Sequence, residues 1–290
     1  MIKKTFIGIG ILMLLVLSLF YFKVIWVLAP YYDVEQPIEL EVPVMDMQAY
    51  KEIWGTHRRP YIYTLGASGA GGALCVVGID HTKDPRDPQL DSIQHHWQKF
   101  DADIALVEGR VGNLITWLQD PVTELGEGGM VTQLANEKGI QLYSWESKRE
   151  DEIAFLLKKY PPEEVAMFYA FRPYFSNLRY GKYDDPEAQL QEYLASRTDY
   201  DGIRGVFETW QELDAKWQAD FPGIGWRDYG AGKGYPEGYL DEIWNLINIY
   251  RDEHMIMVIH ELVQKGNRVF VTMGASHAPR IENTLKAALK

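Results

Sequence analysis

The chain has 290 residues, of which 47% are hydrophobic and 24% charged, and its formal net charge is −12. This composition is typical of a folded globular protein and excludes an intrinsically disordered one. The acidic balance also argues against nucleic acid as a partner, because binding to phosphates requires neutralising Lys and Arg. The single cysteine, Cys75, cannot form an intramolecular disulfide, and its apolar neighbours predict a place in the core.

An apolar run from Thr5 to Phe22 follows Lys3 and Lys4 at the start of the chain. About 18 apolar residues are long enough to span a bilayer. Residues 1–30 are therefore predicted to be a membrane anchor, with a cleaved signal and a buried core helix as alternatives. The positive charge at the start predicts that the N-terminus lies inside and that the remaining chain lies outside the cytoplasm, in the periplasm or the extracellular space.

Aromatic residues follow this run and predict a belt at the membrane interface: Tyr21, Trp26, Tyr31 and Tyr32. The acidic, proline-punctuated stretch after them predicts a linker over residues 31–48. Residues 49–290 are then expected to form a single α/β domain.

Four short, nearly continuous apolar runs predict buried parallel strands: Leu74–Ile79, Ile104–Val107, Ile140–Trp145 and Val269–Met273. Helical spacings of apolar residues lie between the strands. The alternation of strand and helix predicts a mainly parallel sheet flanked by helices.

The middle of the chain, about residues 151–250, carries only helical patterns. One helix is expected to open at Pro161 and Pro162, and another to run from Ile203 to Trp217. We expect a large helical insertion before the last strand, which would form a cap over the site. Its tryptophans are expected to be core residues.

Ionisable side chains follow the carboxyl ends of all four predicted strands: His81, Glu108, Glu146 and His277. In open parallel sheets, ligands bind outside these ends. The four side chains are therefore predicted to form one site. Local roles are the alternatives: a helix cap for His81, a surface position for His277, and charge pairing for Glu108 and Glu146.

Two chemistries fit such a set. Two imidazoles and one or two carboxylates can hold a divalent metal and leave a position open for water. Without metal, a His–Glu pair can deprotonate water directly. Either Arg110 or Arg251 is a candidate to stabilise an oxyanion.

These residues resemble a known superfamily, the one that joins TraB and TIKI proteins, erythromycin esterases and ChaN proteins. Gly78-Ile79-Asp80-His81 and Gly274-Ala275-Ser276-His277 are similar to its paired Gly-x-x-His motifs. Three further segments are similar to its second strand, its third strand and the helix before its last strand: Ala105–Arg110, Leu142–Glu146 and Tyr250–Met255. The order of all five agrees from about residue 72 to 282, and the likeness is greatest to the TraB and TIKI type.

The resemblance implies a hydrolase of peptides or esters, since some members are metal-dependent peptidases and others hydrolyse a macrolide ester. It supports His81, Glu108, Glu146 and His277 as site residues and adds Arg251 as a supporting one. If the site holds a divalent metal such as Mn, Co or Zn, the expected ligands are His81, Glu108 and His277, with Asp80 and Glu146 as further candidates. Some members bind haem or regulate pheromones instead. A ligand-binding protein and a peptide-binding regulator are therefore the alternatives to an enzyme.

Other catalytic motifs do not occur. The sequence contains neither a His-Glu-x-x-His segment nor a Gly-x-Ser-x-Gly elbow. Gly230–Gly234 includes Lys233 but lacks the Ser or Thr that a nucleotide loop needs after the Lys. The segment therefore predicts a mobile loop, with a lid as one role for it. His95, His96 and His260 are expected to face solvent.

Overall fold

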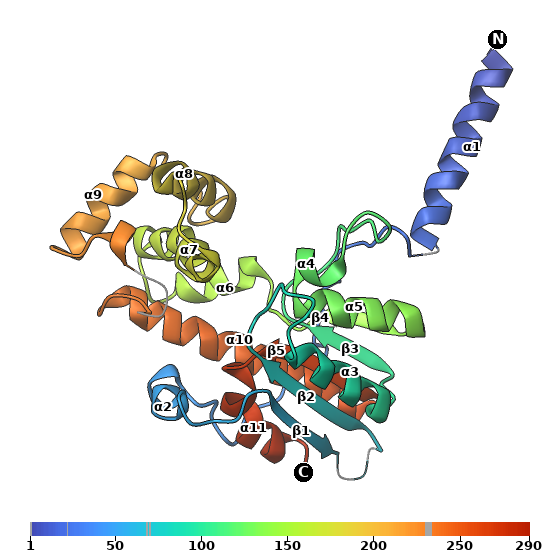
Figure 1. The fold of residues 1–290 in the computed structure, drawn as a ribbon. Helices are drawn as coiled ribbons and strands as arrows, with labels where there is room; N and C mark the ends of the chain where they lie inside the picture. Colours follow the sequence, from blue (N-terminus) through green and yellow to red (C-terminus); the bar gives the residue numbers. More distant parts are fainter. Residues whose placement is uncertain (1, 22, 68, 70, 230–233) are drawn as a thin grey trace. The chain divides into compact units, whose positions relative to one another are not determined.

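The computed structural model describes residues 2–290 apart from 22, 68, 70 and 230–233 (Figure 1). The predicted glycine loop at 230–234 thus lies almost wholly outside the described residues. The chain forms two compact units. Unit 1 comprises residues 1–146 and 251–290, and unit 2 comprises residues 147–250.

Unit 1 is built on a five-stranded sheet with the strand order β1-β2-β5-β3-β4. All neighbouring strands are parallel except β1 and β2, which are antiparallel. The strands are β1 (Tyr61–Gly66), β2 (Ala73–Ile79), β3 (Ile104–Val107), β4 (Gln141–Ser144) and β5 (Arg268–Gly274). The predicted α/β class with a mainly parallel sheet is confirmed, as are its four parallel strands.

The sequence patterns did not indicate β1. It lies at the edge of the sheet, and most of its side chains are only partly buried. A strand of this kind lacks the continuous apolar run that marks a strand buried on both faces. Its antiparallel pairing with β2 therefore became visible only in the structure.

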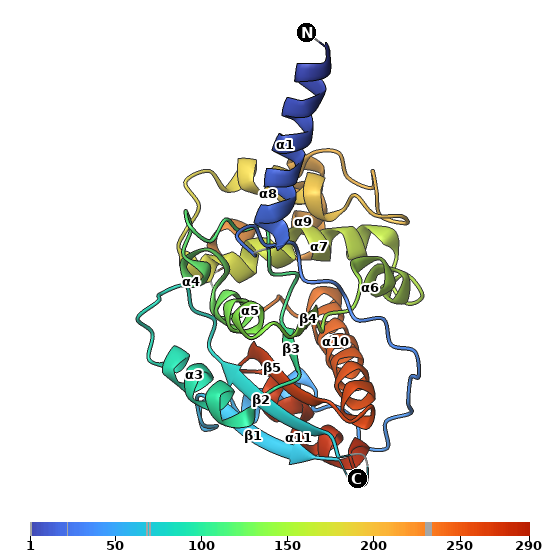
Figure 2. The same ribbon diagram turned by 90° about the vertical axis from the view of Figure 1, so that its right-hand side faces the viewer.

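Helices cover both faces of the sheet, as Figure 2 shows. One face carries α3 (Gln89–Phe100) and α5 (Glu127–Lys138), with the short α4 (Pro121–Leu125) before α5. The other face carries α11 (His277–Ala288) and the C-terminal part of α10 (Tyr239–Gln264). Cys75 lies in the apolar core between the sheet and α3, and burial raises the pKa of its thiol to about 11, so that it is an inert core residue as expected.

The first helix, α1 (Ile2–Tyr21), is followed by a segment that is bonded to the rest of unit 1. Backbone hydrogen bonds join residues 24–29 to residues 111–116, and residues 30–32 to the end of β4. Further on, the backbone N–H groups of Glu35 and Gln36 donate to Glu261, and Met45 bonds to α11. The helix α2 (Met47–Ile53) begins within the stretch predicted as a linker.

The four residues of the predicted aromatic belt differ in exposure. Trp26 is buried, Tyr31 is partly buried against the guanidinium of Arg110, and the hydroxyl of the partly buried Tyr32 donates to Glu261. Tyr21 is exposed. A belt at a membrane interface stays a prediction. Over the described residues, no helix is both long enough and apolar enough to cross a bilayer.

The regular elements among the described residues of unit 2 are all helices. It contains α6 (Arg149–Leu156), α7 (Pro162–Asn177), η1 (Leu178–Tyr180), α8 (Pro186–Arg197), α9 (Trp210–Asp220), η2 (Trp226–Asp228) and the start of α10. Its core is aromatic, with Trp217 and Trp226 fully buried against Phe171. The helix expected from Ile203 begins only at Trp210, where Thr209 forms a capping box with Glu212. That unit 2 acts as a cap stays a prediction.

Candidate functional site

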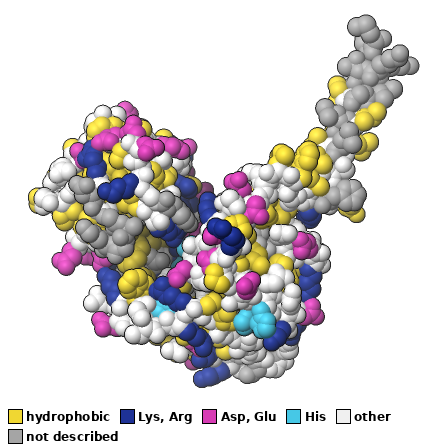
Figure 3. All heavy atoms as spheres, viewed as in Figure 1, with side chains coloured by type: hydrophobic (Ala, Val, Ile, Leu, Met, Phe, Trp, Pro, Cys, Tyr) yellow, Lys and Arg dark blue, Asp and Glu magenta, His cyan; other side chains and the backbone are white. Residues whose placement is uncertain are grey.

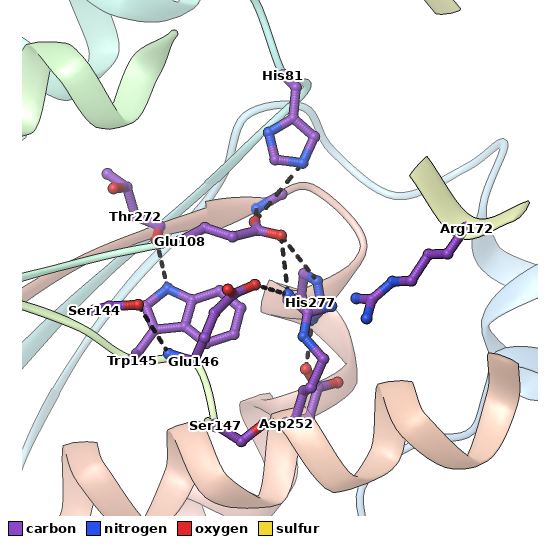
Figure 4. Close-up of polar contacts among 12 residues, drawn as sticks. His81, Glu108, Ser144, Trp145, Glu146, Ser147, Arg172, Asp252, Thr272 and His277 are labelled. Atoms are coloured by element: carbon purple, nitrogen blue, oxygen red, sulfur yellow. Dashed lines mark hydrogen bonds and ion pairs between the residues drawn. The ribbon is translucent and has the colours of Figure 1, made fainter. Parts of the chain in front are cut away.

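The strand order brings the predicted residues to one edge of the sheet. Because β5 lies between β2 and β3, the carboxyl ends of these three strands are neighbours. His81 follows β2, Glu108 follows β3, and His277 begins α11 after β5. Figure 4 shows the carboxylate of Glu108 between the two imidazoles.

Glu108 faces one imidazole with each of its oxygens. Its Oε2 lies 3.7 Å from Nε2 of His81, and its Oε1 lies 3.8 Å from Nε2 of His277. The backbone N–H of Gly274, at the end of β5, donates to Oε2 over 2.8 Å. These distances make Glu108 the shared partner of both histidines.

The environment of Glu108 favours its ionised form. Burial by itself would raise the pKa of this carboxyl, but the electrostatic effect of the neighbouring His81, His277 and Arg251 and the hydrogen bond from the Gly274 N–H outweigh burial. The net effect holds the pKa of Glu108 well below its usual value. An ionised Glu108 can act as an anionic ligand, and it is unsuited to act as a general acid.

The Nδ1 atom of His81 lies 2.5 Å from Oε1 of Glu127, the first residue of α5. Glu127 is buried, and its other oxygen accepts from the backbone N–H of Thr82 over 3.4 Å. A carboxylate at Nδ1 favours the tautomer that carries its proton there. This contact therefore orients His81 with Nε2 toward Glu108.

The Nδ1 atom of His277 has the same kind of partner. It lies 2.5 Å from Oδ1 of Asp252, and the other oxygen of Asp252 is 3.0 Å from the guanidinium of Arg280. Asp252 and Arg280 are fully buried, and Nε of Arg280 donates to the carbonyl of Met45. A buried chain of charges thus fixes His277 from the side opposite Glu108.

Arg251 joins the two glutamates of the predicted site. Its guanidinium lies 3.3 Å from Oε1 of Glu108 and also donates to Glu146. It lies over the indole ring of Trp145, whose Nε1–H donates to the carbonyl of Thr272 at β5. Arg251 and Glu146 therefore belong to the same constellation as Glu108.

The glycines of the two Gly-x-x-His segments are explained by close packing. A Cβ atom on Gly274 would lie 2.8 Å from Nε2 of His81 and 3.4 Å from Oε2 of Glu108. A Cβ atom on Gly78 would lie 2.6 Å from Cβ of Ala278, in α11. One glycine leaves room for the first histidine, and the other lets the helix of the second histidine approach the sheet.

Two predicted candidates lie elsewhere. Asp80 is exposed, and its carboxylate pairs with Arg59 at 3.0 Å instead of turning to Glu108. Arg110 donates to the carbonyl of Ala29 and lies against Tyr31. Neither side chain joins the constellation, and of the two candidate arginines only Arg251 contacts Glu108 and Glu146.

The nitrogen and oxygen donor atoms of the site are of the kinds that bind a divalent metal ion. As the described side chains stand, no group of three or more His, Cys, Asp or Glu residues could hold a metal. Nevertheless, the donors fit in kind: both imidazoles present Nε2 to an ionised carboxylate, and both have carboxylate partners at Nδ1. Metal-binding histidines almost always have such partners on the second ring nitrogen. His81, Glu108 and His277 are thus the residues that would hold a metal, with Glu146 beside them.

Sequence reasoning missed Glu127, Asp252 and Arg280. The sequence around Glu127 did contain a signal, because Gly126, Gly128 and Gly129 surround it. Glycines destabilise a helix, so three of them at the start of a helix indicate that the backbone there packs closely against another segment. A Cβ atom on Gly129 would lie 2.1 Å from the carbonyl oxygen of Pro121. Asp252 lies next to Arg251 in the segment Tyr250–Met255, whose similarity to the superfamily's helix before the last strand was a signal for it.

No family model matches this chain, and neither does any curated protein or solved structure.

Proposed function

We propose that this chain is a membrane-anchored hydrolase that works outside the cytoplasm and cleaves a peptide or an ester with the help of a divalent metal, Mn, Co or Zn. The anchor is the apolar segment at the start of the chain, and the active site is the constellation around Glu108.

One observation carries the enzymatic part of the proposal. His81 and His277 both have a carboxylate at Nδ1 and both direct Nε2 to an oxygen of Glu108. A helix cap or a surface histidine would need no such pair of partners. Two oriented imidazoles around one ionised carboxylate are what a metal-assisted hydrolytic site requires.

The residues of the site would have three roles in this reaction: binding the metal, positioning its ligands and stabilising the charge that develops on the substrate. A bound metal would lower the pKa of its water and supply a nucleophile at neutral pH. His81, Glu108 and His277 hold the donor atoms, and Glu127 and Asp252 keep the two rings in position. Arg251 presents its guanidinium beside Glu108 and Glu146, where it stabilises negative charge that develops on the carbonyl oxygen of the substrate.

A metal-free hydrolase is the second candidate, and the contact between His277 and Asp252 favours it. An imidazole whose Nδ1 donates to a buried carboxylate can accept a proton at Nε2, because the carboxylate stabilises the imidazolium that forms. In this version His277 takes a proton from water directly.

The test is elemental analysis of the purified full-length chain after loading with Mn, Co or Zn, together with the variants His81→Ala and His277→Ala. His95→Ala is the matched control, since His95 is an exposed histidine on α3. We expect bound metal in the wild type and in the control, and at least a tenfold lower metal content in both site variants after the same loading.

Absence of metal from the loaded wild type would refute the metal-dependent version. Hydrolysis of peptide or ester substrates that persists without metal and disappears in His277→Ala would then support the metal-free version. Bound metal or haem without turnover of any substrate would instead indicate a ligand-binding protein or a regulator.

A further inference from the structure

The loop after β3 carries two large apolar side chains in an exposed position. Trp117 is 73% exposed and Leu118 is 67% exposed. Hydrogen bonds hold the turn that carries them in place. The backbone N–H groups of Leu118 and Gln119 both donate to the carbonyl of Ile115. The backbone N–H of Ile115 donates to the side-chain oxygen of Gln119. Their exposure is therefore a feature of a defined turn.

Exposed apolar side chains are concentrated in this part of the molecule. Among the described residues, every exposed large hydrophobic side chain except Trp54 lies in α1, in the segment after it, or in this turn. The segment after α1 contributes Val27, which is 63% exposed. Figure 3 shows yellow side chains along the described part of α1 and on the surface at its base.

Hydrogen bonds tie the turn to the end of α1. The carbonyl of Leu19, in the last turn of α1, accepts from the N–H of Val24 over 2.9 Å. The carbonyl of Val24 in turn accepts from the N–H of Thr116 over 3.0 Å, and Ile25 pairs with Ile115. The last turn of α1 and the backbone next to Trp117 are thus within about 10 Å of each other.

This proximity identifies the partner. The interfacial region on each side of a bilayer is roughly 5–8 Å thick, and tryptophan is enriched in it. If the apolar segment at the start of the chain is the anchor proposed above, its end near Tyr21 brings the turn to that interface. Lys23, exposed at the junction, adds a positive charge next to the lipid headgroups.

We propose that Trp117, Leu118 and Val27 form a second membrane contact, which inserts into the outer interface of the bilayer beside the end of α1. This inference rests on the membrane attachment in the proposed function, and it is independent of the hydrolytic site. The contact would hold unit 1 against the lipid surface at a second point.

The test measures membrane depth in the full-length chain reconstituted into phosphatidylcholine vesicles. Single cysteines are introduced by Leu118→Cys, Leu14→Cys and Trp54→Cys and labelled with an environment-sensitive fluorophore. Trp54 is the matched control, since it is 61% exposed but lies at the end of α2. Labelled wild type gives the background from buried Cys75.

Lipids with a nitroxide near the headgroup are then used as quenchers for positions 118 and 54, and lipids with a nitroxide on the acyl chain are used for position 14. We expect quenching at position 118 to exceed that at position 54 by at least about threefold, as for a side chain in the interface. Equal quenching at 118 and 54, with strong quenching at 14, would overturn the second contact and leave the anchor intact. Absence of quenching at position 14 would overturn the membrane attachment, and the second contact with it.

Discussion

At the scale of single residues, the site depends on carboxylates that touch no substrate. Glu127 and Asp252 each lie 2.5 Å from Nδ1 of a site histidine, and the distant oxygen of Asp252 faces the buried Arg280. Removing one partner of a buried ion pair lowers the free energy of unfolding by about 3–5 kcal/mol. A substitution at Asp252 would therefore change the stability of the fold as well as the function of the site. Glu127 contacts Nδ1 of His81 and the backbone N–H of Thr82, which makes it the better position for a test.

We predict that Glu127→Gln weakens metal binding by about 10–100-fold, because the amide no longer matches the proton at Nδ1 as the carboxylate does. Titration of the full-length variant with Zn measures the change. Glu137→Gln is the control, since Glu137 is an exposed glutamate on the same helix. Equal affinity in the two variants would show that Glu127 does not position His81.

At the scale of elements, the central strand β5 determines the space available to the site. Its last residue, Gly274, donates to Glu108 and lies against His81, so that an added methyl group would meet Nε2 of His81 at 2.8 Å. Contacts below 3.0 Å are not tolerated without movement, and the imidazole is the group that can move. The glycine is therefore part of the binding geometry as well as of the strand.

We predict that Gly274→Ala lowers metal affinity at least about tenfold while the chain keeps its helical circular dichroism. Gly66→Ala is the control, because Gly66 also ends a strand and a Cβ atom there would meet nothing within 4 Å. If Gly274→Ala binds metal as tightly as Gly66→Ala, the close approach of His81 to β5 has no bearing on the site.

At the scale of the whole molecule, the segment after α1 is bound to unit 1 through Glu261. This buried carboxylate accepts from the Tyr32 hydroxyl, from Lys265 and from the backbone N–H groups of Glu35 and Gln36. Burial would raise the pKa of Glu261, but the hydrogen bonds from Lys265, Tyr32 and the two N–H groups prevail and lower it from 4.5 to about 2. Because the folded-state pKa is depressed, the stabilisation is complete above about pH 4.5 and is lost as the pH falls toward 2.

We predict that Glu261→Gln lowers the free energy of unfolding by about 2–3 kcal/mol at pH 7, and that its difference from wild type shrinks as the pH falls below 4.5. Urea unfolding of the full-length chain at several pH values measures this. Glu39→Gln, an exposed change in the same segment, is expected to have little effect at any pH. A difference that does not vary with pH would contradict the role of the Glu261 charge.

Much of the fold was predictable because strands buried on both faces leave continuous apolar runs in the sequence. Those runs located four strands, and their carboxyl ends placed His81, Glu108, Glu146 and His277 at one edge of a sheet. The edge strand β1 escaped prediction, since a half-exposed strand leaves no such run. The roles of Asp80 and Arg110 also escaped it, because neighbours in sequence do not fix the direction of a side chain.

The sequence by itself thus determined the α/β class, the order of the strands along the chain and the candidate site residues, all of which follow from local patterns of polarity. Only the tertiary structure decided that β5 lies between β2 and β3, that Glu108 faces both histidines, and that Glu127 and Asp252 support them. It also decided that Trp26 and Tyr32 belong to the domain while Trp117 and Leu118 stand exposed. These facts depend on contacts between residues far apart in the chain, which the periodicity of a sequence does not encode.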